Sequence, residues 1–167
     1  MIFYLGDYIP WWILKAMGTR DGYSGRLLDL KQSQASSLNS FTELLGKEIS
    51  RTYAGITAVP SHDPATGIGT GVRLLAKQLA SKIHSADGRD FLRRTVKIPK
   101  LAHGGDRSVQ THLNSMAAEQ PHRYTGGRVL VLDDIMTSGN SFIASRKLLM
   151  DAGAEEVICV ALGKTKS

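Results

Sequence analysis

The sequence predicts an α/β fold in which one domain is built on a mostly parallel, twisted sheet flanked by helices. Four consecutive apolar residues at 129–132 have the composition of a strand that is buried on both faces. Segments of strand composition alternate along the chain with segments of helical periodicity, which is typical of parallel sheets covered by helices. The length of 167 residues suits a single domain with a substantial core.

The N-terminal part of the chain, residues 1–50, is predicted to contain a hairpin and a helix and to precede an α/β core at residues 51–167. Residues 1–8 have strand composition. Residues 26–31 alternate imperfectly between apolar and polar, and this pattern predicts a second strand and a hairpin-like start.

Two helices and a short strand are expected next. Residues 36–49 repeat apolar side chains at helical spacing. Residues 55–59 have the composition of a short strand, which Pro60 ends. Residues 72–79 carry the i, i+3, i+4, i+7 apolar stripe of an amphipathic helix.

The second half of the chain contains a long polar segment between two structured parts. Residues 91–96 are predicted to form a strand. Residues 97–107 are polar, basic and rich in glycine, and loops of this length are often mobile lids. Residues 109–119 fit a strand or a helix. Residues 141–152 are predicted to be helical, and residues 156–162 supply the last strand.

Composition narrows the class of protein without selecting a ligand. The formal net charge of +6 and the pI near 9.6 favour anionic partners such as phosphates, nucleotides or nucleic acid. Cys159 is the only cysteine, which excludes an intrachain disulfide and a cysteine-based zinc module. No apolar run approaches the roughly 18 residues that a membrane span requires, and no secretory signal is seen, so we expect a cytoplasmic location.

The most informative stretch is residues 127–141, where a buried strand ends in two carboxylates, Asp133 and Asp134. A short polar turn follows and leads into a helix, whose N-terminal N–H groups and dipole favour an anion. The carboxylates suit a vicinal diol, and the turn suits a phosphate. Together they describe a ribose 5-phosphate site, with the phosphate bound by Thr137, Ser138, Gly139, Asn140 and Ser141.

Two other phosphate-binding motifs do not fit. A P-loop needs G-x-x-x-x-G-K-[ST] before a helix, but the Gly-Lys-Thr at 163–165 ends the chain and has Ile158 at the first glycine position. The glycines at 67–71 read G-x-G-x-G, with Val72 next, and begin too far after the strand for a dinucleotide fingerprint.

Residues 129–141 resemble the phosphoribosyl pyrophosphate (PRPP) signature of type I phosphoribosyltransferases, and the resemblance extends over roughly residues 50–165. Residues 56–63 stand where that family places its pyrophosphate-binding loop. The basic segment at 97–114 stands where the family has a flexible lid. The resemblance implies the type I phosphoribosyltransferase fold.

Within that family the chain is most similar to the ComF-like branch, which is linked to DNA uptake, through its Lys-rich lid with Gln and Asn. The sequence departs from that branch in two ways. It has no cysteine-rich N-terminal module, and Thr111 stands where the lid usually has an arginine three residues before Asn114.

The family resemblance implies displacement of pyrophosphate from C1 of PRPP by a nitrogenous base or amine, with Mg²⁺ as cofactor. Asp133 and Asp134 would bind the ribose hydroxyls. Mg²⁺ would be held mainly by PRPP, with Asp133 or Asp134 as the candidate protein ligand. The pyrophosphate would be bound by Ser61, His62, Lys97, Lys100 and Arg107, and the proton carriers considered are His62 and His103.

Several functional properties stay open at this stage. The alternative function is a non-catalytic protein that binds PRPP or a nucleotide and regulates a partner, with a link to DNA uptake or nucleic acid. A homodimer is expected from the family, and no membrane partner is expected. The resemblance implies that residues 1–50 form a small hood over the site and select the acceptor base. These residues do not identify the base, and Trp11, Trp12 and Tyr23 are the candidates to contact it. The two tryptophans are interpreted first as a core rim or dimer contact.

Overall fold

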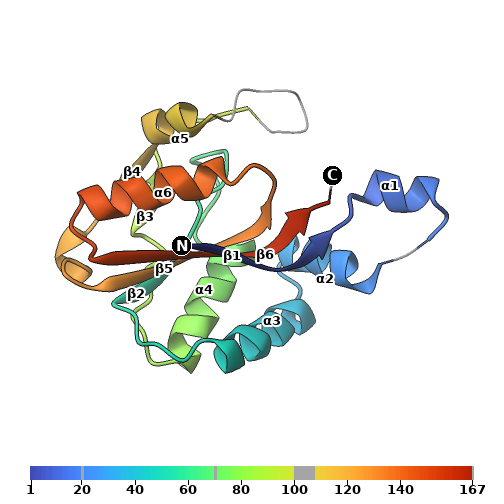
Figure 1. Cartoon of the computed structure of the whole chain (residues 1–167), viewed down its shortest axis with the longest axis horizontal. Coiled ribbons are helices and arrows are strands. Elements are labelled where there is room, and N and C mark those ends of the chain that lie inside the picture. Colours follow the sequence, from blue (N-terminus) through green and yellow to red (C-terminus); the bar gives the residue numbers. More distant parts are fainter. Residues whose placement is uncertain (20, 70, 100–107, 167) are drawn as a thin grey trace.

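The computed structural model describes the whole chain except residues 20, 70, 100–107 and 167, and it has the predicted α/β class (Figure 1). Within the described residues the main sheet has the strand order β1-β6-β5-β2, and each neighbouring pair is parallel. A second, antiparallel sheet pairs β3 with β4. The strands are β1 (Ile2–Tyr8), β2 (Gly55–Ala58), β3 (Leu92–Arg94), β4 (Met116–Ala118), β5 (Arg128–Met136) and β6 (Glu156–Thr165).

Helices cover both faces of the main sheet, as Figure 1 shows. One side carries α2, α3 and α4, and the other side carries α6 with α5 beside it. A short 3₁₀ helix precedes β5. The helices are α1 (Trp11–Ala16), α2 (Gly22–Lys31), α3 (Ala35–Glu48), α4 (Gly71–Lys82), α5 (Val109–Ser115), the 3₁₀ helix η2 (Pro121–Arg123) and α6 (Asn140–Asp151).

The predicted strand at 26–31 is wrong, because these residues belong to helix α2. Asp21 caps that helix, since its carboxylate accepts a hydrogen bond from the Ser24 N–H at 2.8 Å. Leu27 and Leu30 then fall three residues apart on one buried face. The start of the chain is therefore no hairpin, and β1 pairs in parallel with β6 at the edge of the main sheet.

The other elements lie close to the predicted ones. The helices predicted at 36–49, 72–79 and 141–152 correspond to α3, α4 and α6. Residues 109–119, which fitted either structure, contain both, because α5 is followed directly by β4. Of the predicted lid, residues 100–107 lie outside the described part of the chain.

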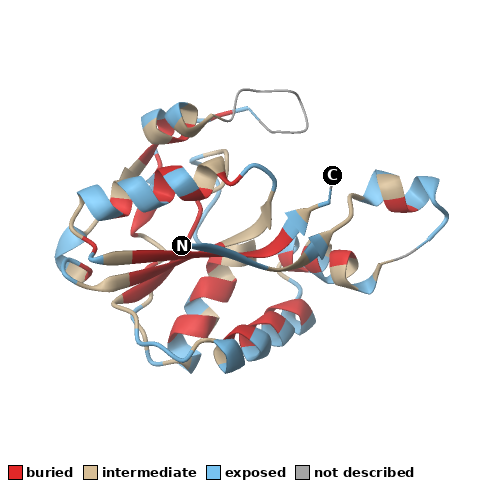
Figure 2. Ribbon diagram, in the orientation of Figure 1, coloured by how far each residue is buried: buried red, intermediate tan, exposed pale blue. Residues whose placement is uncertain are grey.

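The predicted burial of β5 on both faces is confirmed (Figure 2). Leu130 and Leu132 pack into the cluster formed with α2, α3 and α4, whereas Val129 and Val131 pack into the cluster on the α6 side. All four side chains are fully buried. Strand β5 therefore lies between two hydrophobic layers, and its two carboxylates, which are half-buried, follow the four fully buried residues.

Residues 1–50 share the main core. Leu27, Leu30, Leu38, Phe41 and Leu45 all belong to the cluster that packs on β2, β5 and β6. The division of the chain at residue 50, and the role of its first part as a hood, stay predictions. Trp11 and Trp12 lie on α1 with exposed fractions of 57% and 70%, outside the core. None of the described helices combines the length and apolar character of a membrane span.

Burial raises the pKa of the Cys159 thiol to about 12, from an ordinary value of 9.0. Above pH 9 the thiol ionises in the unfolded protein but stays protonated in the folded protein. The stability that the protonated Cys159 thiol contributes is therefore complete below pH 9 and is lost as pH rises toward 12. We expect the unfolding free energy to fall by about 1.4 kcal/mol per pH unit in that range through this group. Urea denaturation between pH 8.5 and 10.5 should show that the unfolding free energy falls more steeply with pH in the wild type than in Cys159→Ala. Equal slopes in the two proteins would contradict this prediction.

Candidate functional site

The carboxyl ends of β2 and β5 place the predicted site residues at one edge of the sheet. The two strands are parallel neighbours, with Ala58 in register with Leu132. The chain therefore leaves β2 toward Ser61 and His62 at the same edge where β5 presents Asp133 and Asp134. In open α/β sheets this edge is where ligands bind.

Asp133 is held by two neutral hydrogen-bond donors. The Asp134 N–H donates to its Oδ1 at 2.9 Å, and the Ser141 hydroxyl at the start of α6 donates to its Oδ2 at 3.3 Å. Burial raises the pKa of Asp133 well above its usual range, and the charge of neighbouring Asp134 raises it further. Such perturbed carboxyl groups are frequent at functional sites.

Asp134 has different surroundings, because successive strand residues point to opposite faces of the sheet. Its Oδ1 accepts a hydrogen bond from the Ile135 N–H at 2.6 Å. Its Oδ2 lies 3.5 Å from the Lys31 ammonium at the end of α2. Lys31 was missed by sequence reasoning, because residues 26–31 were interpreted as a strand far from the motif.

The predicted phosphate turn connects β5 to the N-terminus of α6. Thr137 and Ser138 are exposed, and the Thr137 hydroxyl lies 3.0 Å from that of Thr165 at the end of β6. Gly139 has φ +81°, a conformation that favours glycine, and Asn140 is the first helical residue. The turn thus presents N–H groups and hydroxyls at a helix N-terminus, where an anion is favoured.

The residues after β2 form the loop that was predicted to bind pyrophosphate. The Ser61 hydroxyl lies 3.3 Å from His62 Nδ1, and the His62 carbonyl accepts a hydrogen bond from the Ile98 N–H at 2.9 Å. Lys97 forms an ion pair with Asp63 at 2.7 Å, which places Lys97 against this loop. Lys100, His103 and Arg107 lie outside the described residues.

A buried arginine supports this loop from the second sheet. Arg94 is 3% exposed and donates to the carbonyls of Ser61, at 2.8 Å, and Pro60, at 3.2 Å. It also donates to the Ser115 hydroxyl at 2.7 Å. Sequence reasoning missed Arg94, although a charged residue at an inward position of the strand predicted at 91–96 is an unusual pattern that could have identified it.

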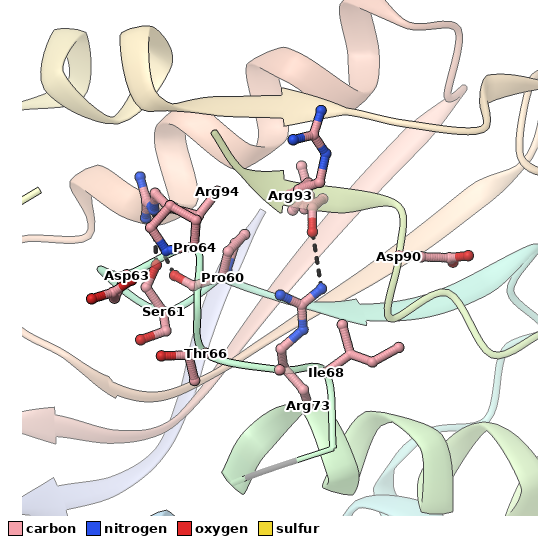
Figure 3. A pocket seen from close by; sticks show the side chains of 12 residues that line it. Pro60, Ser61, Asp63, Pro64, Thr66, Ile68, Arg73, Asp90, Arg93 and Arg94 are labelled. Atoms are coloured by element: carbon pink, nitrogen blue, oxygen red, sulfur yellow. Dashed lines mark hydrogen bonds between the residues drawn. The ribbon is translucent and has the colours of Figure 1, made fainter. Parts of the chain in front are cut away.

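A small cavity of about 220 Å³ lies between the loop and β3 (Figure 3). Arg73, from the first turn of α4, points across it and donates to the Leu92 carbonyl at 3.0 Å. The residues that line the cavity include Ser61 but none from β5 or from the turn at 137–141. It is lined by Pro60, Ser61, Asp63, Pro64, Thr66, Gly67, Ile68, Arg73, Asp90, Leu92, Arg93 and Arg94.

Comparisons with known proteins show which proteins this chain is similar to. The sequence model of the phosphoribosyl transferase domain family matches residues 66–167. The adenine phosphoribosyltransferase of Polynucleobacter asymbioticus is 30% identical over 70 residues, which are 42% of this chain and 41% of that protein. A solved structure of the allosteric regulatory enzyme of purine biosynthesis aligns with 74% of this chain and 25% of its own, at 19% identity and a TM-score of 0.49.

The family match is the finding that identifies the chain. It spans more than half of the sequence and includes β5, the acid pair, the phosphate turn and α6. The chain spans only about two fifths of the curated relative and one quarter of the solved structure. This chain belongs to the phosphoribosyl transferase domain family.

Proposed function

We propose that the protein is a PRPP-dependent phosphoribosyltransferase that displaces pyrophosphate with a nitrogenous base or amine. The observation that carries this proposal is the acid pair and phosphate turn at the carboxyl end of β5, beside the loop after β2. The family match covers the first of these two parts, residues 133–141. These parts lie at one edge of the sheet, which suits one extended ligand with a phosphate, a diol and a pyrophosphate.

The proposed reaction forms one bond and breaks one bond at C1 of the ribose. The nucleophile's nitrogen bonds to C1 while the bond from C1 to the pyrophosphate oxygen breaks, and pyrophosphate leaves with the electron pair. The nitrogen then loses its proton to solvent. Asp133 and Asp134 bind the ribose hydroxyls, and residues 137–141 bind the 5-phosphate. Catalysis would come from positioning and electrostatic stabilisation of positive charge at C1.

Mg²⁺ fits the donor chemistry of this edge. Asp133 and Asp134 offer carboxylate oxygens, which Mg²⁺ prefers, and PRPP and water would supply its other ligands. When bound, the metal would neutralise charge on the leaving pyrophosphate. The protein residues proposed for the pyrophosphate are Ser61, His62, Lys97, Lys100 and Arg107, of which the first three lie on or against the loop after β2.

The finer assignment is also a proposal. We place the chain nearest the ComF-like branch because of its lid, where Gln110 donates to the Asn114 side chain at 2.8 Å within α5. A homodimer and a cytoplasmic location are proposed by analogy with the family. Adenine is the first acceptor to test, because the curated relative is an adenine phosphoribosyltransferase.

Pyrophosphate release tests the proposal directly. Incubating the protein with PRPP, Mg²⁺ and a panel of bases and amines that begins with adenine should release pyrophosphate with at least one acceptor. The Asp133→Asn variant should lose most of this activity, because the ribose then loses a charged hydrogen-bond acceptor. Absence of turnover, together with a salt-sensitive gel shift of nucleic acid, would instead favour the regulatory alternative.

A further inference from the structure

Lys31 brings a positive charge from the first fifty residues to the acid pair. Its ammonium lies 3.5 Å from Asp134 Oδ2. Helix α2 is fixed against the sheet nearby, because the Tyr23 hydroxyl donates to the Leu162 carbonyl at 2.5 Å and Leu27 is fully buried. The position of Lys31 therefore follows from the packing of α2 on the main sheet.

The two acids at the end of β5 differ in their partners. Asp133 is bonded to a backbone N–H and the Ser141 hydroxyl, both neutral. Asp134 has the Lys31 ammonium. Two adjacent carboxylates repel each other, and the Lys31 ammonium reduces this repulsion while it holds Asp134 in place.

We propose that Lys31 is a positioning residue of the PRPP site, which acts by orienting and neutralising Asp134. This inference rests on the proposed function. Asp134 keeps capacity to bind a ribose hydroxyl, because a carboxylate has about four acceptor positions, the Ile135 N–H occupies one of them, and Lys31 forms an ion pair at 3.5 Å. Lys31 lies outside the segment that the family model matches. The N-terminal region therefore contributes to donor binding.

Calorimetric titration with PRPP and Mg²⁺ tests the role of Lys31. Lys31→Met should raise the Kd for PRPP about tenfold, which corresponds to loss of one close charge near the surface. Lys31→Arg should restore binding to within about threefold, because it keeps the charge and a donor. In turnover, KM for PRPP should rise while kcat changes little. Inorganic pyrophosphate, which has no ribose, should bind all three proteins with similar Kd.

Lys47→Met is the matched control. Lys47 occupies the last turn of α3 as Lys31 occupies the last turn of α2, and it is exposed. This variant should bind PRPP like the wild type, and the Tm of each variant should stay near the wild-type value.

The outcomes separate this inference from the proposed function. Unchanged or tighter PRPP binding by Lys31→Met would overturn it, and so would an equal loss of pyrophosphate binding, which would indicate a general charge effect. Loss of PRPP binding that Lys31→Arg does not restore would also contradict it. A wild-type protein that binds no PRPP would overturn the proposed function, and this inference with it.

Discussion

Replacing Asp133 and Asp134 together with Asn is expected to abolish the Mg²⁺-dependent thermal stabilisation that PRPP gives the wild-type protein. At a ligand concentration 100 times Kd, binding to the folded state adds about 2.7 kcal/mol, which is about 5–10 °C in Tm for a chain of this size. The double variant keeps the shape of both side chains but removes both charged acceptors from the ribose diol. Differential scanning fluorimetry with and without PRPP measures the effect.

The unliganded double variant should remain folded. The pKa of Asp133 is raised by burial, so its ionised form disfavours the folded state and an uncharged Asn relieves that cost. The ion pair between Asp134 and Lys31 is partly exposed and adds little stability. Asp29→Asn with Asp151→Asn removes two exposed charges and should keep the full PRPP shift. An undiminished shift in the Asp133 and Asp134 variant would refute the site assignment.

The sequence was sufficient for the parts of the fold that depend on local pattern. Strand β5 could be predicted because residues 129–132 are apolar without interruption, and the turn at 137–141 because small polar residues follow two acids. These features lie within one continuous stretch. Their burial and geometry follow from that stretch and from the general rule that ligands bind at the carboxyl edge of parallel strands.

The parts that sequence reasoning missed depend on contacts between distant segments. Helix α2 was mistaken for a strand because Leu27, Leu28 and Leu30 fit both periods over so few residues, and only the Asp21 cap and packing on the sheet distinguish them. The pair between Lys31 and Asp134 joins residues about a hundred positions apart, so no local pattern marks it. Arg94 likewise contacts a segment that is distant in the sequence, because it donates to the Ser61 carbonyl in the loop after β2.

Arg94→Met is expected to destabilise the protein by about 3 kcal/mol, because it leaves buried acceptors without their donor. The carbonyls of Pro60 and Ser61 and the Ser115 hydroxyl all accept hydrogen bonds from this guanidinium. Methionine fills part of the space but donates to none of them. Urea denaturation at pH 7 measures the change in unfolding free energy.

Arg93→Met gives a matched control on the same strand. The Arg93 side chain is 62% exposed and pairs with Glu119 at the surface, so its loss should cost less than about 1 kcal/mol. If both variants lose the same stability, Arg94 does not anchor the loop. If Arg94→Met alone is destabilised, the loop after β2 is held by β3. PRPP should then bind this variant more weakly even where it is fully folded, because Ser61 and His62 lose their fixed position beside the acid pair.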